Sequence, residues 1–323
     1  MQDTRDHQPS TRTTGHRQTR IGLLSAVALL TAATAAPAQA AGYQTETAAV
    51  SVDTIAGGLE QPWSVEVLPD GAYLVTELPG RLRLVRDGKL SEPITGLPDI
   101  SVGGQGGLLD VAVDPRFADN RKIYFTASIA GDGGRGTAVF SATLSPDDTA
   151  LSDVKRLFVM NRLTGAGQHF GARIAIRDDG TLIFGIGDRG QGRRAQDPQD
   201  HAGSLMRINR DGSVPNDNPY AASGQALPEI WSTGHRNPQG ITIDPQDGSL
   251  YTVEHGARGG DEINVPAPGK NYGWPVISYG KDYSGAKLGE GTAKAGLEQP
   301  LHYWDPSIAP GAIAVYRGKM FPE

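Results

Sequence analysis

Residues 65–77, which read Val-Glu-Val-Leu-Pro-Asp-Gly-Ala-Tyr-Leu-Val-Thr-Glu, decide the fold. Apolar residues alternate with other residues up to a Pro69-Asp70-Gly71 turn, and an apolar stretch leads out of that turn. Period-two alternation around a short turn is typical of a β-hairpin, because successive side chains of a strand point to opposite faces. This stretch therefore predicts two antiparallel strands.

The same hairpin pattern returns along the chain. Further copies run over residues 111–127, 174–188 and 241–254, and a fifth begins at Ile313-Ala314-Val315. Corresponding positions lie 46, 63, 67 and 72 residues apart, which is room for one four-stranded blade and loops of variable length. A hairpin repeated at this spacing predicts an all-β fold, and specifically a β-propeller.

Other fold classes fit the pattern less well. No stretch of 12 residues shows clear helical periodicity, which a parallel α/β fold would need between its strands. A β-sandwich would not repeat one hairpin five times at this spacing. Residues 43–56 are predicted to form a strand with no partner of its own, and such a strand can complete the last blade of a ring. We therefore expect a six-bladed β-propeller, with the rest of the fifth blade and most of the sixth beyond Glu323.

The composition is typical of a chain with many tight turns, and it excludes nucleic-acid binding driven by net charge as well as cysteine-based sites. The 323 residues include 43 Gly and 22 Pro, which suits short strands joined by turns. The net charge of −6 gives no electrostatic reason to expect nucleic acid as a partner. The chain has no Cys, which excludes disulfides and thiolate metal sites.

The N-terminus carries an export signal. Arg12, Arg17 and Arg20 precede an apolar run over residues 21–36, and a small-x-small site follows at residues 38–40. This order is typical of a secretory signal peptide, and the run is too short and Ala-rich for a spanning helix. We expect residues 1–40 to be removed and residues 41–323 to form the propeller domain. The mature protein is then periplasmic or secreted, without stable membrane insertion.

Two loop segments before predicted inner strands hold polar residues among glycines. Residues 103–109 read Gly-Gly-Gln-Gly-Gly-Leu-Leu, where Gln105 could bind a ligand that the glycines let the backbone approach. Residues 167–173 read Gly-Gln-His-Phe-Gly-Ala-Arg, where His169 could accept a proton near neutral pH. The alternative for residues 103–109 is a mobile surface loop, and the alternative for His169 is a purely structural role.

Two further segments suggest an oxyanion site and a cation site. Residues 234–240 crowd Arg236, Asn237 and Gln239 at a strand entrance, and the arginine could face a developing negative charge. Residues 254–262 combine carboxylates with a Gly-rich loop, which are the oxygen ligands that calcium takes. Asn271-Tyr272-Gly273-Trp274-Pro275 follows, with aromatic rings for stacking or for core packing.

Other sequence motifs give no indication of a catalytic or binding site. No P-loop, HExxH or Gly-x-Ser-x-Gly motif occurs. The Gly-x-Gly-x-x-Gly patterns at residues 131–136 and 185–190 open no amphipathic helix, so we interpret both as turns. Arg189, Arg193 and Arg194 are predicted to form a solvated basic cluster.

Taken in order along the chain, these segments resemble a known family. The residues that carry the resemblance are 105–109, 168–171, 234–240, 254–256 with 260–264, and 271–275. Together they resemble the soluble aldose sugar dehydrogenases of the glucose/sorbosone dehydrogenase family, over residues 55–323. The resemblance implies a six-bladed propeller that binds pyrroloquinoline quinone (PQQ) over its central opening. It also implies an aldose substrate, a lactone product and an external electron acceptor.

The resemblance also implies roles for individual residues. His169 would take the proton from the anomeric hydroxyl while hydride passes from C1 to the quinone, and Arg236 would stabilise the negative charge that develops there. Gln105, Arg236, Asn237 and Gln239 would bind PQQ. The backbone carbonyls of Gly256 and Ala257 would hold a calcium ion that acts as a Lewis acid.

The chain departs from the family pattern at three places. Gln168 stands where the glucose-specific members have Asp, which fits the broader aldose branch and leaves the preferred sugar open. Ala257 stands where relatives often have Pro, which main-chain ligation tolerates. The family's basic residues for the cofactor carboxylates would lie beyond Glu323, so we expect the chain as given to be weakly active or inactive.

Two other functions compete with sugar oxidation. A calcium-dependent lactonase would need a cluster of carboxylates and Asn at the channel centre, where this chain offers His, Arg, Gln and Asn. A non-catalytic binding propeller would be expected to lose the catalytic residues, whereas His169, Arg236 and Asn237 are all present.

Overall fold

The structure is a computed structural model that describes residues 41–319 with the exception of residue 47. The predicted signal peptide, residues 1–40, lies outside the described residues. The chain divides into two units, Met1–Thr54 and Ile55–Glu323. In the first unit, β1 (Ala41–Gln44) and β2 (Ala49–Val52) form an antiparallel hairpin.

That hairpin corrects one prediction. Residues 43–56 do not form a single unpartnered strand, since Val52 pairs with Ala41 and Val50 with Tyr43. A strand needs partners for its backbone N–H and C=O groups, and residues 41–44 provide them here. The sequence pattern showed the alternation of apolar residues but not the turn that lets the segment fold back on itself.

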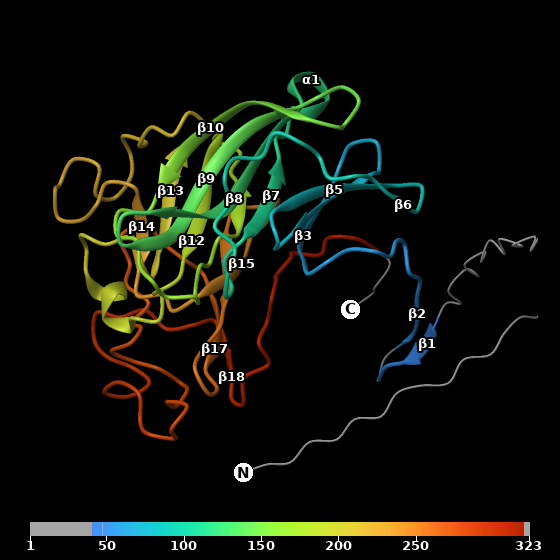
Figure 1. The fold of residues 1–323 in the computed structure, drawn as a ribbon. Helices are drawn as coiled ribbons and strands as arrows, with labels where there is room; N and C mark the ends of the chain where they lie inside the picture. Colours follow the sequence, from blue (N-terminus) through green and yellow to red (C-terminus); the bar gives the residue numbers. More distant parts are fainter. Residues whose placement is uncertain (1–40, 47, 320–323) are drawn as a thin grey trace, which may run out of the picture. The chain divides into compact units, whose positions relative to one another are not determined.

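The second unit contains four antiparallel sheets of four strands each, in sequence order (Figure 1). The first holds β3 (Pro62–Val67), β4 (Tyr73–Glu77), β5 (Arg81–Arg86) and β6 (Lys89–Leu90). The second holds β7 (Leu108–Val113), β8 (Lys122–Gly131), β9 (Gly134–Leu144) and β10 (Leu151–Val159). The third holds β11 (Ile174–Ile176), β12 (Thr181–Ile186), β13 (Ser204–Asn209) and β14 (Ile230–Thr233). The fourth holds β15 (Pro238–Ile243), β16 (Leu250–Glu254), β17 (Asp261–Asn264) and β18 (His302–Trp304).

Four of the five predicted hairpins are confirmed, each as the first two strands of a sheet. In the hairpin that decides the fold, Val65 pairs with Val75 and the Leu68 N–H donates to the Ala72 carbonyl at 2.8 Å. The equivalent turn of the third sheet closes with the Arg177 N–H on the Thr181 carbonyl at 2.9 Å. The alternation of apolar residues thus gave the right strands and the right turns.

The first strands of the sheets lie next to one another. β7 contacts both β3 and β11, and β11 contacts β15. Consecutive meander sheets that meet along their first strands are the arrangement of propeller blades. The structure therefore has a propeller-like arrangement with four blades in its described residues.

Apolar side chains fill the spaces between neighbouring blades. One buried cluster joins the first two blades and includes Leu74 of β4 and Phe125 of β8, both with no exposed surface. A second joins the second and third blades, where the ring of Phe158 meets the edge of Phe184 at 5.0 Å between centroids. Because these side chains are fully buried, truncation of one to Ala is expected to cost about 2–5 kcal/mol. The clusters hold the blades at a fixed angle to one another and so fix their loops.

Residues 313–315, predicted to open a fifth hairpin, form no strand. They pair with no strand of the described chain, and a strand is defined by such pairing. The segment still passes close to the first strand of the fourth blade, since a side chain at Gly240 would meet the backbone of residues 312 and 313.

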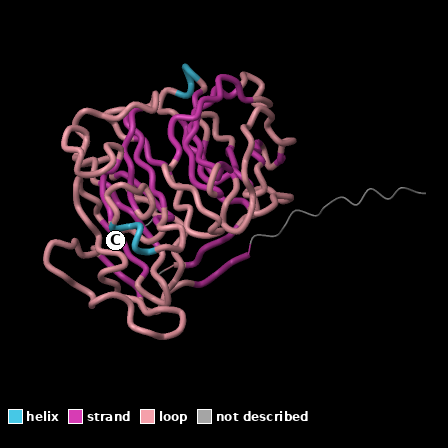
Figure 2. The backbone as a smooth tube through the Cα atoms, turned by 60° about the vertical axis from the view of Figure 1, so that its left-hand side comes forward, coloured by secondary structure: helices cyan, strands magenta, loops and turns pink. Residues whose placement is uncertain are grey.

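Helices contribute little to the described structure. Figure 2 shows strands and loops with two short helical segments, α1 (Phe117–Asn120) and a 3-10 turn over Gly192–Gln196. No helix among the described residues is both long and apolar enough to span a membrane.

Candidate active site

A pocket of about 320 Å³ opens where the first strands of all four blades begin. Its polar lining comes from Gln105, Asn237, Gln239 and His255. Its apolar walls come from the side chains of Trp63, Leu78, Leu109 and Phe170, and backbone of Gly104 and Gly171 completes it. Gln105, predicted to bind a cofactor, therefore meets Asn237 and Gln239, predicted to bind it too, in one cavity, although more than a hundred residues separate Gln105 from them.

His169 lies beside this pocket, between Gln105 and Asp188. Its backbone N–H donates to Oε1 of Gln105 at 2.7 Å, and its ring Nδ1 lies 2.6 Å from Oδ1 of Asp188. The backbone at His169 is left-handed, with φ of +57°, a conformation that turns the side chain away from the course of the loop. The ring is 13 % exposed, and its Nε2 makes no hydrogen bond within the described chain. The outer nitrogen of this histidine is thus available to a substrate.

Asp188 fixes the ring of His169 and was not identified from the sequence. Its Oδ1 also accepts the Gly190 N–H at 2.7 Å, and its Oδ2 accepts the indole N–H of Trp274 at 2.8 Å. The carboxylate is 1 % exposed. A buried carboxylate held by this set of donors presents a fixed acceptor to Nδ1–H of the histidine. The only sequence signal was its place directly after an apolar strand, at the same blade end as the other loops.

Gly187 explains why the 185–190 glycine pattern exists. A Cβ at Gly187 would collide with the carbonyl oxygen of His169 and approach Oδ1 of Asn237 to 2.7 Å. The pattern is therefore no dinucleotide motif, and the interpretation as a turn holds. Its glycine lets the strand end pass directly beneath the His169 loop.

Asn237 ties the His169 loop to the fourth blade. Its Oδ1 accepts the Gly171 N–H at 3.1 Å, and the residue is 2 % exposed. Its Nδ2 has no partner within the described chain and belongs to the lining of the pocket. The side-chain amide of Gln239 likewise makes no hydrogen bond there, while its backbone carbonyl accepts Nε of Arg173 at 3.2 Å. Both amides can therefore bind a ligand.

Arg236 lies next to the pocket rather than in its lining. Its Nη1 donates to the His255 carbonyl at 3.2 Å, and its guanidinium lies 5.3 Å from the ring centroid of Trp274. The Nε–H is buried without a partner. Arg236 lines an adjacent cavity of about 10 Å³, and His255 lines both cavities. The side chain of His255 thus separates Arg236 from the pocket that holds the amide side chains predicted to bind the cofactor.

Burial lowers the pKa of His255, and the nearby charges of Arg236 and His169 lower it further, although Asp261 acts in the opposite direction. Nε2–H of the ring donates to the Pro310 carbonyl at 3.0 Å. A neutral His255 therefore adds no positive charge beside the guanidinium of Arg236.

A fully buried network holds Arg236 from behind. The carboxylate of Glu254 accepts the backbone N–H of Arg236 at 2.6 Å and contacts Nδ1 of His235 at 2.8 Å. The other ring nitrogen of His235 lies 2.9 Å from the hydroxyl of Ser232. Ser232 and His235 have no exposed surface, so this Ser-His-Glu arrangement is closed to substrate and acts as a brace.

The predicted calcium loop gathers main-chain oxygens. A Cβ at Gly256 would collide with the carbonyl oxygens of both Gly259 and Gly260. Asp261 holds the loop, with Oδ1 on the Gly256 N–H at 2.8 Å and Oδ2 on the Ser307 hydroxyl at 2.7 Å. No cluster of three or more His, Cys, Asp or Glu side chains suited to a metal occurs in the described chain. The main-chain oxygens gathered in this loop are of the ligand type that the family resemblance implies for calcium.

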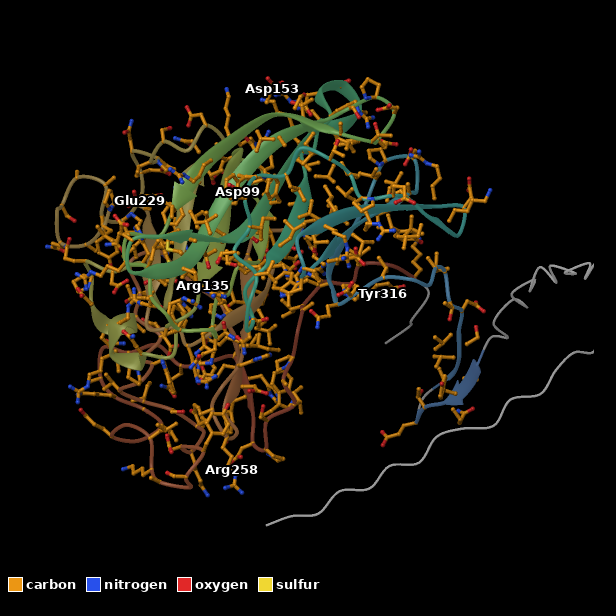
Figure 3. The ribbon with its side chains drawn as sticks, in the orientation of Figure 1. Asp99, Arg135, Asp153, Glu229, Arg258 and Tyr316 are labelled. Atoms are coloured by element: carbon orange, nitrogen blue, oxygen red, sulfur yellow. The ribbon has the colours of Figure 1, made fainter. Side chains whose placement is uncertain are left out.

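The two predicted calcium ligands face different spaces. Gly256 lines the small cavity that also contains Arg236, whereas Ala257 lines a separate hollow of about 630 Å³ with Arg258. Figure 3 shows Arg258 at the outer end of this loop. The structure thus leaves Gly256 nearer to the cofactor residues than Ala257.

The basic cluster predicted at residues 189–194 is wrong as a solvated feature. Arg189 has no exposed surface, and Arg194 pairs with buried Asp200 at 2.7 Å, so that only Arg193 is exposed. Tertiary packing, which local composition does not report, draws two of the three cations inside.

Comparison with known proteins places this geometry in a family. The model of the glucose/sorbosone dehydrogenase family matches residues 59–323. The aldose sugar dehydrogenase of Escherichia coli is 42% identical over 281 residues, which cover 85% of this chain and 76% of the relative. An apo-form crystal structure of a soluble aldose sugar dehydrogenase from the same organism superposes with a TM-score of 0.79 at 42% identity, covering 82% of this chain and 78% of that chain.

A structure with cofactor is also similar. The PQQ-bound form of an aldose sugar dehydrogenase from Streptomyces coelicolor superposes with a TM-score of 0.66 at 26% identity, covering 84% of this chain and 73% of that chain. The resemblance seen in the sequence motifs is thereby confirmed. The chain belongs to the glucose/sorbosone dehydrogenase family and is an oxidoreductase of the sugar dehydrogenase class.

Proposed function

We propose that the protein oxidises the anomeric C1 hydroxyl of aldose sugars to lactones, with PQQ and Ca²⁺ as cofactors. The observation that carries this proposal is the pocket that brings together Gln105, Asn237 and Gln239 beside His169. Each of the three has a side-chain amide donor without a partner in the described chain, and the aromatic and aliphatic walls suit a flat heterocycle. The residues present therefore fit PQQ.

When bound, PQQ would accept the hydride from C1 of the sugar, and Ca²⁺ at the carbonyl oxygens of Gly256 and Ala257 would act as a Lewis acid. The sugar gives up one hydride and one hydroxyl proton, which leaves the C1=O bond of the lactone. An external electron acceptor would then take up the two electrons that the hydride carries to the cofactor.

His169 is the proposed general base. The bond from Nδ1 to Asp188 selects the tautomer that carries its hydrogen on Nδ1, which leaves the lone pair on Nε2 for the sugar hydroxyl. Asp188 then stabilises the imidazolium that forms once the proton has moved. This pair is expected to contribute about 10²–10⁴-fold to turnover, as general bases commonly do.

Arg236 is the proposed electrostatic catalyst. Its Nη1 and Nη2 are held by the His255 carbonyl and by the hydroxyl of Tyr283 at 3.5 Å, while Nε–H is left without a partner. A fixed buried cation stabilises negative charge without having to reorganise during the reaction. The Glu254 carboxylate holds the backbone of Arg236 before substrate arrives.

We further propose that residues 1–40 direct export, so that sugar oxidation takes place in the periplasm or outside the cell. The motif of basic residues, apolar run and small-residue site supports this. The blades described above would belong to a ring of six, and Gln168 beside the base would favour a broad range of aldoses over glucose alone.

The test is dye reduction by a full-length version of the protein after addition of PQQ and Ca²⁺, with a panel of aldoses. We expect turnover that requires both additions, and loss of turnover in His169→Ala with PQQ binding, followed by its absorbance, retained. His302→Ala, an exposed histidine on β18, is the matched control. Turnover in His169→Ala at the level of that control would remove His169 as the base. Absence of any turnover with PQQ demonstrably bound would remove the proposed reaction.

A further inference from the structure

Arg189 is the most strongly constrained residue near the site, and the proposed mechanism does not use it. Its side chain has no exposed surface, and its backbone is left-handed with φ of +57°. Its Nε–H is buried without a hydrogen-bond partner. No carboxylate of the described chain lies within ion-pair distance of its guanidinium. A buried cation under these conditions lowers stability, so a compensating role is expected.

The side-chain hydrogen bonds and the ring contact of Arg189 all go to one loop. Nη2 donates to the Ala166 carbonyl at 2.7 Å, and Nη1 donates to the Gln168 carbonyl. The guanidinium carbon lies 3.4 Å above the ring centroid of Phe170. Arg189 therefore binds three alternate residues of the segment 166–170, on either side of His169 in the sequence.

This loop has to satisfy several geometric demands at once. His169 must reach Gln105 with its N–H and Asp188 with its ring, and the following Gly171 must reach Asn237. Each bond comes from a different blade or loop, so a small shift of the backbone would break at least one of them. The left-handed backbone at His169 adds strain that the surroundings must hold.

We infer that Arg189 is a positioning residue that clamps residues 166–170 so that His169 meets Asp188 and Gln105 simultaneously. Asp188 and Arg189 are consecutive, so one turn holds the ring of His169 with a carboxylate and the backbone of the same loop with a guanidinium. The inference rests on the proposed role of His169 as base, but the clamp itself is a property of the chain without cofactor.

The chemistry of the clamp requires arginine. Two carbonyl oxygens two residues apart and the face of a benzene ring match the fork and the plane of a guanidinium. A lysine keeps the charge but has neither the planar face nor two donors held at a fixed separation. Burial lowers the pKa of Arg189 to about 10, with the charge of Arg194 acting in the same direction and that of Asp188 opposing, so the side chain is charged at neutral pH.

The first test is amide hydrogen exchange in the full chain without cofactor. In Arg189→Lys, we expect the amides of residues 164–171 to exchange about 10- to 100-fold faster, as loss of a charged hydrogen bond implies, with the other blades unchanged. Arg207→Lys is the matched control, because Arg207 is a buried arginine of the same blade that lies 5.5 Å over Trp231 and pairs with Asp179. Uniformly faster exchange in all blades, or no change in residues 164–171, would overturn the inference.

The second test is turnover with PQQ and Ca²⁺. We expect kcat of Arg189→Lys to fall about 100-fold, as small misplacement of a catalytic group does, with KM for the sugar changing less than about threefold. Arg189→Gln keeps one donor to the loop, so its kcat should lie between those of wild type and Arg189→Lys. It also serves as the second variant if Arg189→Lys folds poorly. A rise in KM at unchanged kcat would contradict a positioning role for the base. If His169→Ala retains turnover, the proposed role of His169 as base fails, yet the exchange experiment still decides whether Arg189 clamps the loop.

Discussion

Nδ1 of His169 lies 2.6 Å from Oδ1 of Asp188, although the whole β11–β12 hairpin separates the two residues in the sequence. His169 precedes β11 and Asp188 follows β12, so the hairpin returns the chain to the end at which it started. The pairing of Ile174 with Phe184 sets the register that brings them together. Blade geometry thus builds the base and its partner within a single supersecondary unit.

The first prediction concerns the carboxylate of this pair. Asp188→Asn replaces an acceptor with an amide that cannot serve both the Trp274 indole N–H and Nδ1–H of His169, so the histidine loses its tautomer. We expect kcat to fall by between about 100-fold and about 10⁴-fold with PQQ binding retained. Asp211→Asn, in an exposed turn, is the control. Steady-state kinetics with equal kcat for both variants would show that Asp188 does not orient the base.

The second prediction concerns the other oxygen of Asp188. Trp274→Phe removes the indole N–H at 2.8 Å but keeps an aromatic face near Arg236. Because one charged hydrogen bond is lost, kcat should fall about tenfold. Trp231→Phe also loses an indole bond, to the Pro266 carbonyl at 3.2 Å, but lies away from the site. A larger loss in Trp231→Phe than in Trp274→Phe would contradict the role assigned to the indole.

The fold was predicted largely from short-range signals in the sequence. The alternation around residues 68–71 and its three full repeats predicted the first two strands of every blade, because strand period and turn chemistry are local properties. Residues 43–56 misled for the opposite reason, since the alternation does not say which segment supplies the hydrogen-bond partner. The outer strands of each blade were implied only by the spacing.

The site was predicted in part for similar reasons. Gln105, Asn237 and Gln239 stood out because unusual polar residues preceded apolar strands, and the structure brings them into one pocket. Asp188 and Arg189 follow a strand and look like an ordinary turn, and nothing local shows that this turn reaches back to the His169 loop. Such contacts depend on hairpin register and blade packing, which composition and periodicity do not contain.

The third prediction concerns an ion-pair network under the pocket. Nη1 of Arg173 contacts Oδ1 of Asp110 at 2.7 Å and the Ser64 hydroxyl at 3.0 Å, and Nε reaches the Gln239 carbonyl. One guanidinium of the third blade therefore binds the first strands of the other three. Arg173→Met leaves the buried carboxylate unpaired and should lower the free energy of unfolding by about 3–5 kcal/mol.

A double-mutant cycle with Asp110→Asn isolates this pair. The second substitution removes the charge that Arg173→Met leaves unpaired, so the double variant should be more stable than the sum of the two single effects predicts. Urea unfolding of the four proteins measures the coupling. Additive effects would mean that the two side chains do not stabilise one another.

The fourth prediction uses pH, at Glu66 on β3. Burial and, to a smaller extent, the charge of Asp110 raise the pKa of Glu66 to about 7, against the opposing charge of Arg173. The folded protein therefore holds a proton at Glu66 that the unfolded chain, with its ordinary pKa of 4.5, releases. Stability from this group is fully present below pH 4.5 and is lost as the pH rises through about 7.

Glu66→Gln removes the titration while keeping the shape of the protonated side chain. Its free energy of unfolding relative to wild type should therefore rise between about pH 4.5 and 7, with a slope below about 1.4 kcal/mol per pH unit because the group is only partly buried. Urea unfolding at pH 5, 6, 7 and 8 measures the difference, with the exposed Glu92→Gln as control. If the Glu66→Gln and wild-type curves run parallel across this range, Glu66 is ionised in the folded protein and Arg173 outweighs both its burial and the charge of Asp110.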